Sequence, residues 1–242
     1  MNEGDDWHFD IQHIAAQTRF IRNVAHEENI IVVYLENDIK AWPLWKRNHP
    51  EYPELIPRIT DTIALVLALR KYELHLNGHS GGGSFVLGYI QSQKKIPSYV
   101  NRISFLDSDY GYDSTFTQKL VDWLKADRSH HLSVFAYNDS VVIYNGKPLV
   151  SPTGGTWYRS KLMKQDLSKF FSFHLVRRDS AEQFSSPRNQ ANFFLVDNPE
   201  GKIFHTVQVE RNGFIHSVLV GTKHENKNYL YWGPRAYTNL IK

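Results

Sequence analysis

Short apolar runs alternate with helical segments along most of this chain of 242 residues. Five such runs are predicted to be strands, at residues 29–35, 73–76, 101–106, 131–137 and 170–176. Between them, apolar residues recur every three to four positions, which is the period of a helix. This alternation predicts an α/β fold: one domain, residues 1–242, with a doubly wound, mostly parallel sheet and helices on both faces.

Helices are expected at residues 9–25, 55–71, 83–90 and 116–125, with a short helix around residues 163–167. The last 60 residues have a weaker pattern. Residues 203–209 could be strand or irregular chain, and residues 213–219 resemble a loop that enters a helix.

Composition excludes several classes of protein. Hydrophobic residues make up 41% of the chain, too many for global disorder, yet no apolar run approaches the roughly 20 residues that span a bilayer. The net charge of +3 is too small to indicate nucleic-acid binding. Cysteine is absent, which excludes disulfides, thiolate metal sites and cysteine nucleophiles. The histidines show no metal-binding spacing, so neither a metal nor a cofactor is expected.

The strongest local motif is GHSGGG at residues 78–83, a G-x-S-x-G match centred on Ser80. It follows a predicted strand and opens a predicted helix, and a serine nucleophile requires this context. The turn is tight and strained, so small residues are expected two positions before and after the serine. The helix N-terminus directs free N–H groups at an incoming oxyanion, and the Gly81 N–H is the expected first donor. The motif matches neither common phosphate-binding loop.

With this motif, the order of Ser, acid and His, and the β-α-β context, the chain resembles the α/β-hydrolase superfamily over nearly its whole length. The segment LDSDYGY at residues 106–112 also resembles a stretch of some bacterial serine hydrolases. The resemblance implies a serine hydrolase that cleaves an ester or amide bond through an acyl-enzyme on Ser80. An acyltransferase, or a non-catalytic binding protein on the same frame, is the alternative.

Two aspartates are candidates for the acid that orients the histidine. Asp107 and Asp139 each follow a predicted strand, where the carboxyl ends of parallel strands form a ligand crevice. The superfamily more often places the acid at the position of Asp139, whereas the second likeness favours Asp107. Asp109 is a third candidate. Because the triad needs one acid, at least one of the first two is expected to be a helix cap or an Asx-turn.

The base is expected near the C-terminus, where the superfamily places its histidine. His216 is the first choice because it follows a glycine-containing loop and precedes a helix, and His205 is the second. His79 lies inside the motif and is expected to line the site. Trp42 and Tyr110 are expected to line a pocket for a small-molecule, peptide or sugar acyl substrate.

Only one strand is predicted before the serine-bearing strand, fewer than the superfamily has. The chain is therefore expected to be truncated or processed, a minimal variant with its second oxyanion donor in residues 38–42, or a non-catalytic relative. Residues 1–10 contain no signal peptide. As written, the chain is expected in the cytoplasm, and a truncated chain could be an exported one.

Overall fold

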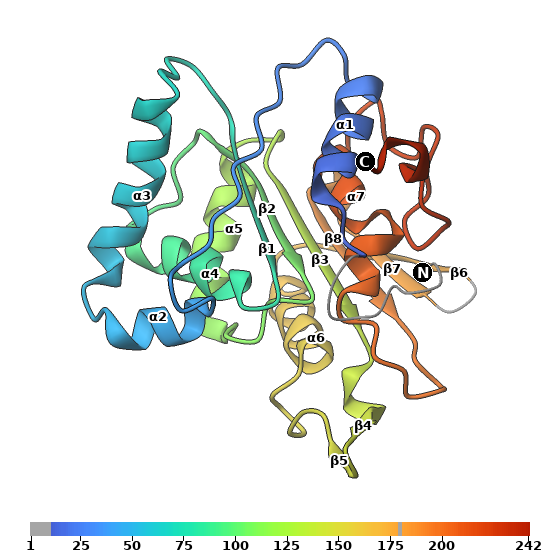
Figure 1. Cartoon of the computed structure of the whole chain (residues 1–242). Helices are drawn as coiled ribbons and strands as arrows, with labels where there is room; N and C mark the ends of the chain where they lie inside the picture. Colours follow the sequence, from blue (N-terminus) through green and yellow to red (C-terminus); the bar gives the residue numbers. More distant parts are fainter. Residues whose placement is uncertain (1–10, 179–180) are drawn as a thin grey trace.

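Six strands form one sheet in the order β1-β2-β3-β8-β7-β6 (Figure 1). The computed structural model describes residues 11–178 and 181–242. Within these residues, β1 to β3 and β8 pair in parallel, whereas β7 and β6 continue the sheet in antiparallel fashion. The strands of this sheet are β1 (Leu74–His79), β2 (Val100–Leu106), β3 (His131–Tyr137), β6 (His174–Arg178), β7 (Ala181–Ser185) and β8 (Ala191–Val196); a separate small hairpin consists of β4 (Ile143–Tyr144) and β5 (Lys147–Pro148).

Helices cover both faces of this sheet. They are α1 (Ile14–Val24), α2 (Trp42–Asn48), α3 (Tyr52–Val66), α4 (Gly82–Ser92), α5 (Thr117–Ala126), α6 (Thr156–Leu167) and α7 (Phe214–Leu219). Single helical turns are η1 (Ser114–Phe116), η2 (Asp139–Val141), η3 (Pro187–Asn189), η4 (Val209–Gly213) and η5 (Thr238–Leu240).

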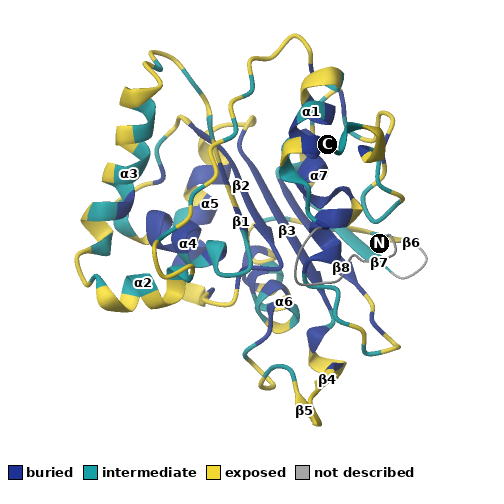
Figure 2. Cartoon of the chain, viewed as in Figure 1, coloured by how far each residue is buried: buried dark blue, intermediate teal, exposed yellow. Residues whose placement is uncertain are grey.

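The central strands are buried along their length (Figure 2), and two large apolar cores lie on opposite faces of the sheet. Ile103 and Phe105 of β2 pack with α4, α5 and α6, whereas the neighbouring Leu106 packs on the opposite face with α1 and α7. Successive side chains of a strand point to opposite faces, so a strand that is covered on both sides buries apolar residues on both faces. The sequence correctly predicts the α/β class and the mostly parallel sheet. The connecting helices α4, α5 and α6 all lie on one face, and α1 and α7 cover the other.

The middle of the chain follows the sequence prediction closely. The run at residues 131–137 is β3, and residues 73–76 and 101–106 fall within or largely within β1 and β2. The expected helix at residues 55–71 is instead α3, which starts earlier and is preceded by α2. The expected strand at residues 170–176 begins later, as β6.

Residues 29–35 form no strand in the structure, and that prediction is wrong. This segment connects α1 on one face to α2 on the other. Its side chains alternate as in a strand: Ile30 and Val32 pack against the α1 and α7 core, whereas Ile31 and Val33 are 54% and 45% exposed. A β-branched run favours extended backbone, but a strand also needs a hydrogen-bonded neighbour, and none pairs with this segment among the described residues.

The C-terminal third differs most from the prediction. The sequence pattern did not identify β7 and β8, and residues 203–209 contain no strand but form the chain that leads from β8 to η4. The first two residues of the expected helix 9–25, and the segment 1–10 with its expected lack of a signal peptide, lie outside the described residues. None of the helices described is long and apolar enough to cross a membrane.

Candidate active site

Ser80 occupies a strained turn between β1 and α4. Its φ is +52°, in the left-handed region that non-glycine residues rarely adopt. Strain of this kind persists only where the surroundings enforce it, and it gathers at functional sites. Ser80 is half-buried, and its hydroxyl forms no hydrogen bond with the residues described.

Two glycines make the close approach of strand and helix possible. A methyl group on Gly78 would lie 2.8 Å from the Gly83 nitrogen, and one on Gly83 would collide with the Ser108 carbonyl oxygen. Gly82, by contrast, has open space on that side. The steric requirement after the serine is therefore at the third position and not, as the motif predicted, at the second. The Ser108 hydroxyl donates to the Gly78 carbonyl at 2.8 Å and so ties this turn to the end of β2.

The backbone amides of Gly81, the residue after Ser80, and of Trp42 lie at the N-termini of α4 and α2. Gly81 precedes α4, and a side chain there would meet the Trp42 nitrogen at 4.0 Å and the Pro43 ring at 3.3 Å. Neither the Gly81 nor the Trp42 N–H donates a backbone hydrogen bond to a described residue. The structure therefore brings the expected first donor next to the segment expected to supply the second. The Trp42 ring itself packs on Phe85 at 4.7 Å and lies partly in the core.

The carboxylate of Asp107 accepts a hydrogen bond from Nδ1 of His205. Asp107 follows β2 and is fully buried, whereas His205 lies in the chain after β8 with its side chain 18% exposed. The second carboxylate oxygen of Asp107 accepts from the hydroxyl of Thr156, the first residue of α6. Sequence reasoning did not identify Thr156, because only the fold places the start of α6 against β2.

These contacts determine the state of the His205 ring. Burial alone would lower the pKa of His205, but the hydrogen bond and charge of Asp107, with a smaller effect of Asp139, raise the pKa above its ordinary value. Because Nδ1 donates its proton to the carboxylate, Nε2 is the nitrogen that can accept a proton. Nε2 forms no hydrogen bond with a described residue. This is the arrangement of a general base oriented by an acid.

His79 lies against His205, with the ring centroids 4.7 Å apart. Its Nε2–H donates to the His205 carbonyl at 3.1 Å, and its Nδ1 lies 3.3 Å from the Gln12 side-chain amide. His79 thus lies next to His205, as a residue that lines the site would, and both of its ring nitrogens have protein partners.

Asp139 has the other role that the sequence allowed, that of a helix cap. Its carboxylate accepts from the Thr156 backbone N–H at 2.8 Å at the start of α6. Burial and the neighbouring charge of Asp107 raise the pKa of Asp139 to about 6. Within residues 11–178 and 181–242, Asp107 forms a hydrogen bond with a histidine and Asp139 does not.

Asp109, two residues after Asp107, is also fully buried. Its carboxyl group accepts from the Ser160 hydroxyl of α6 at 2.9 Å. Burial raises the pKa of Asp109 to about 8, so this side chain is largely uncharged at neutral pH. Tyr110, which follows it, is 36% exposed and so remains at the surface of this region.

His216, the sequence's first choice of base, lies elsewhere. It belongs to α7, is 2% exposed, and stacks on Tyr231 with the ring centroids 5.6 Å apart. Its Nδ1 pairs with the Tyr229 hydroxyl at 3.0 Å. The glycine at position 213 leads directly into the buried helix α7, and among the described residues His205, not His216, forms a hydrogen bond with a candidate aspartate. The signal that favours His205 is its place after β8, a strand that the sequence pattern did not identify.

The structure thus gathers residues from the carboxyl ends of β1, β2, β3 and β8 at one edge of the sheet, as expected for a ligand crevice. No group of metal-ligating residues able to hold an ion occurs among the residues described. Comparison of the chain with family models, with curated proteins and with solved structures gives no match.

Proposed function

We propose that this protein is a serine hydrolase that cleaves an ester or amide bond through an acyl-enzyme on Ser80. The observation that supports this most directly is the pairing of Asp107 with Nδ1 of His205 at the edge of the sheet that carries the Ser80 turn. A hydroxyl needs a base to act as a nucleophile near neutral pH, and the base needs an orienting group. Both groups are present, and both lie in chain that follows strands of the sheet that carries the Ser80 turn.

In the proposed reaction, His205 Nε2 takes the proton of the Ser80 hydroxyl as the oxygen attacks the substrate carbonyl carbon. The carbonyl oxygen becomes an oxyanion, which the Gly81 and Trp42 N–H groups stabilise. The protonated His205 then gives its proton to the leaving alcohol or amine as the bond breaks. Water then reacts with the acyl-enzyme in the same way. His205 takes a proton from the water as its oxygen attacks the acyl carbon, and His205 returns that proton to the Ser80 oxygen as the carboxylic acid product leaves.

The neighbouring groups fit this use of His205. Asp107 stabilises the imidazolium that forms during each half-reaction, and the Thr156 hydroxyl fixes the carboxylate from its other side. Asp109 is largely uncharged at neutral pH, so its burial next to Asp107 adds little repulsion. The N-terminus of α6 adds a favourable dipole for the ionised carboxylates.

The direct test is hydrolysis of p-nitrophenyl esters of increasing acyl length. Ser80→Ala and His205→Gln are each expected to lower kcat by about 10³-fold or more, because the nucleophile and the base act as a unit. Ser84→Ala in α4 and His216→Gln are the matched controls, with melting temperature measured for all four variants. Hydrolysis that persists in Ser80→Ala, or that depends on His216 and not on His205, would exclude the proposal.

A further inference from the structure

The backbone carbonyl of His205 is held by a second histidine. The His79 Nε2–H donates to this carbonyl at 3.1 Å, and the two imidazole rings face each other at an interplanar angle of 36°. Since a carbonyl can only accept, the proton of His79 must lie on Nε2, and Nδ1 is then the acceptor for the Gln12 amide. Every polar atom of the His79 ring therefore has a defined partner.

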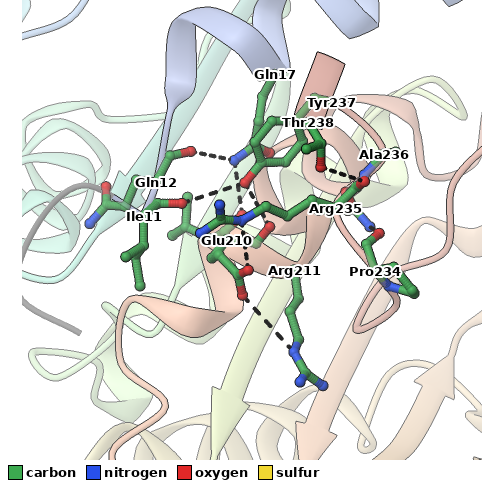
Figure 3. Close-up of polar contacts among 12 residues, drawn as sticks. Ile11, Gln12, Gln17, Glu210, Arg211, Pro234, Arg235, Ala236, Tyr237 and Thr238 are labelled. Atoms are coloured by element: carbon green, nitrogen blue, oxygen red, sulfur yellow. Dashed lines mark hydrogen bonds and ion pairs between the residues drawn. The ribbon is translucent and has the colours of Figure 1, made fainter. Parts of the chain in front are cut away.

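The backbone of Gln12, whose side chain contacts His79, is held in turn by a partly buried hydrogen-bond network (Figure 3). The fully buried Gln17 side chain donates to the Gln12 carbonyl at 2.7 Å and to the Val209 carbonyl at 2.9 Å. Next to it, the Tyr237 hydroxyl donates to the Glu210 carbonyl at 2.7 Å, and Arg235 pairs with the Glu210 carboxylate at 2.7 Å. This network joins the chain before α1, the turn after His205 and the C-terminal segment.

We infer that His79 is a positioning residue for His205, one that holds the backbone and ring of the base at the angle required to reach Ser80. The inference rests on the proposed function. His205 lies in chain without regular secondary structure, and its hydrogen bond to Asp107 fixes only one ring atom. The hydrogen bond from His79 also holds the backbone carbonyl of His205, and the packing of the His79 ring against the His205 ring limits rotation of that ring.

His79 can perform this role over the whole working pH range. Burial and the nearby charge of His205 lower the pKa of His79 to about 3, so its ring remains neutral and its Nε2–H remains a donor. The role is therefore geometric. It predicts that substitution of His79 changes kcat while the acid limb of the pH profile still reports one ionisation, that of His205.

The test compares His79→Phe, which keeps a ring but loses the donor, with His79→Gln, whose amide can still donate to the carbonyl. His79→Phe is expected to lower kcat about 10- to 100-fold with KM changed less than about threefold, as for a displaced catalytic group. His79→Gln is expected to recover most of that loss. Gln12→Leu should lower kcat in the same direction by a smaller factor, and the exposed His26→Phe should have no effect.

A second measurement does not depend on turnover. In the Ser80→Ala background, the proton shared by Asp107 and His205 is expected as a far-downfield resonance in the proton NMR spectrum, and Asp107→Asn is expected to abolish it. His79→Phe should broaden or shift this resonance, and His79→Gln should restore it. If kcat and the resonance are both unchanged in His79→Phe, the inference is overturned. Esterase activity that survives Ser80→Ala would instead overturn the proposed function.

Discussion

At the residue scale, three aspartates within one buried cluster have three different roles. Asp107 orients His205, Asp139 caps α6, and Asp109 is held uncharged by burial. Their sequence contexts are alike, since each follows a buried strand. Their contacts with the described part of the chain distinguish them: Asp107 alone of the three accepts from an imidazole, and Asp139 alone accepts from the first N–H of a helix.

Asparagine substitutions separate these roles. Asp107→Asn is expected to lower kcat by about 10³- to 10⁴-fold, because the amide favours the wrong tautomer of the base. Asp139→Asn should change kcat only a few-fold, since asparagine caps a helix about as well as aspartate does. Steady-state ester hydrolysis by the two purified variants checks this. Equal losses in both, or a larger loss in Asp139→Asn, would assign the acid to Asp139.

How far the sequence predicted the site also depends on particular residues. Ser80 could be proposed because the GHSGGG motif lies between a predicted strand and a predicted helix, and Asp107 because it directly follows a predicted strand. His205 ranked second because it lies nine residues beyond the end of β8, in irregular chain that the pattern left ambiguous between strand and loop. Thr156 and Gln12 carried no local signal, because they reach the site only through the packing of α6 and α1.

At the element scale, the turn between β1 and α4 depends on the contact of α4 with the chain after β2. Gly83→Ala is expected to lower the free energy of unfolding by about 3 kcal/mol or more, because the added methyl group collides with the Ser108 carbonyl. Gly82→Ala, one residue away, should change the free energy of unfolding by less than about 0.5 kcal/mol, since the methyl group added there would meet no other atom. Urea denaturation of both variants measures the difference. Similar losses at the two positions would contradict this account of the turn.

The sequence predicted well those strands whose apolar residues indicate a strand and which also pair with a neighbour in the sheet. β2 and β3 are buried along their whole length because both of their faces are covered. The segment 29–35 has the same β-branched composition but no partner, and pairing is a property of the whole sheet that a local pattern does not contain. The antiparallel strand β7 has a mixed polar sequence because it is half-buried, so its pattern is weak.

At the scale of the whole molecule, buried titratable groups set the pH at which the fold is most stable. Between about pH 4 and 8, the folded state retains the proton on Asp109 that the unfolded chain has lost, so this group lowers the free energy of unfolding as pH rises. The raised pKa values of Asp139 and His205 act in the same direction. Below about pH 6.5, the unfolded chain protonates His75, His79 and His131, which the fold keeps neutral. These three histidines outweigh the two aspartates, so the free energy of unfolding falls as pH decreases.

We therefore expect a maximum of stability near pH 6 to 7. Asp109→Asn should make the free energy of unfolding fall less steeply above this maximum, by up to about 1.4 kcal/mol for each pH unit over which Asp109 titrates. The exposed Asp122→Asn should leave the profile unchanged. Denaturant unfolding from pH 5 to 9 gives the profile. A curve that rises steadily through pH 8, or one that Asp109→Asn does not alter, would contradict this prediction.

The most direct measurement for the central claim is labelling with a fluorophosphonate, followed by mass spectrometry of the peptides. The account predicts a single adduct on Ser80, formed at a rate that His205→Gln and Asp107→Asn each reduce by about 10³-fold. The His216→Gln variant should be labelled at a rate close to that of the unaltered protein. An adduct on another residue, no adduct at all, or a rate that does not depend on His205 would contradict the account.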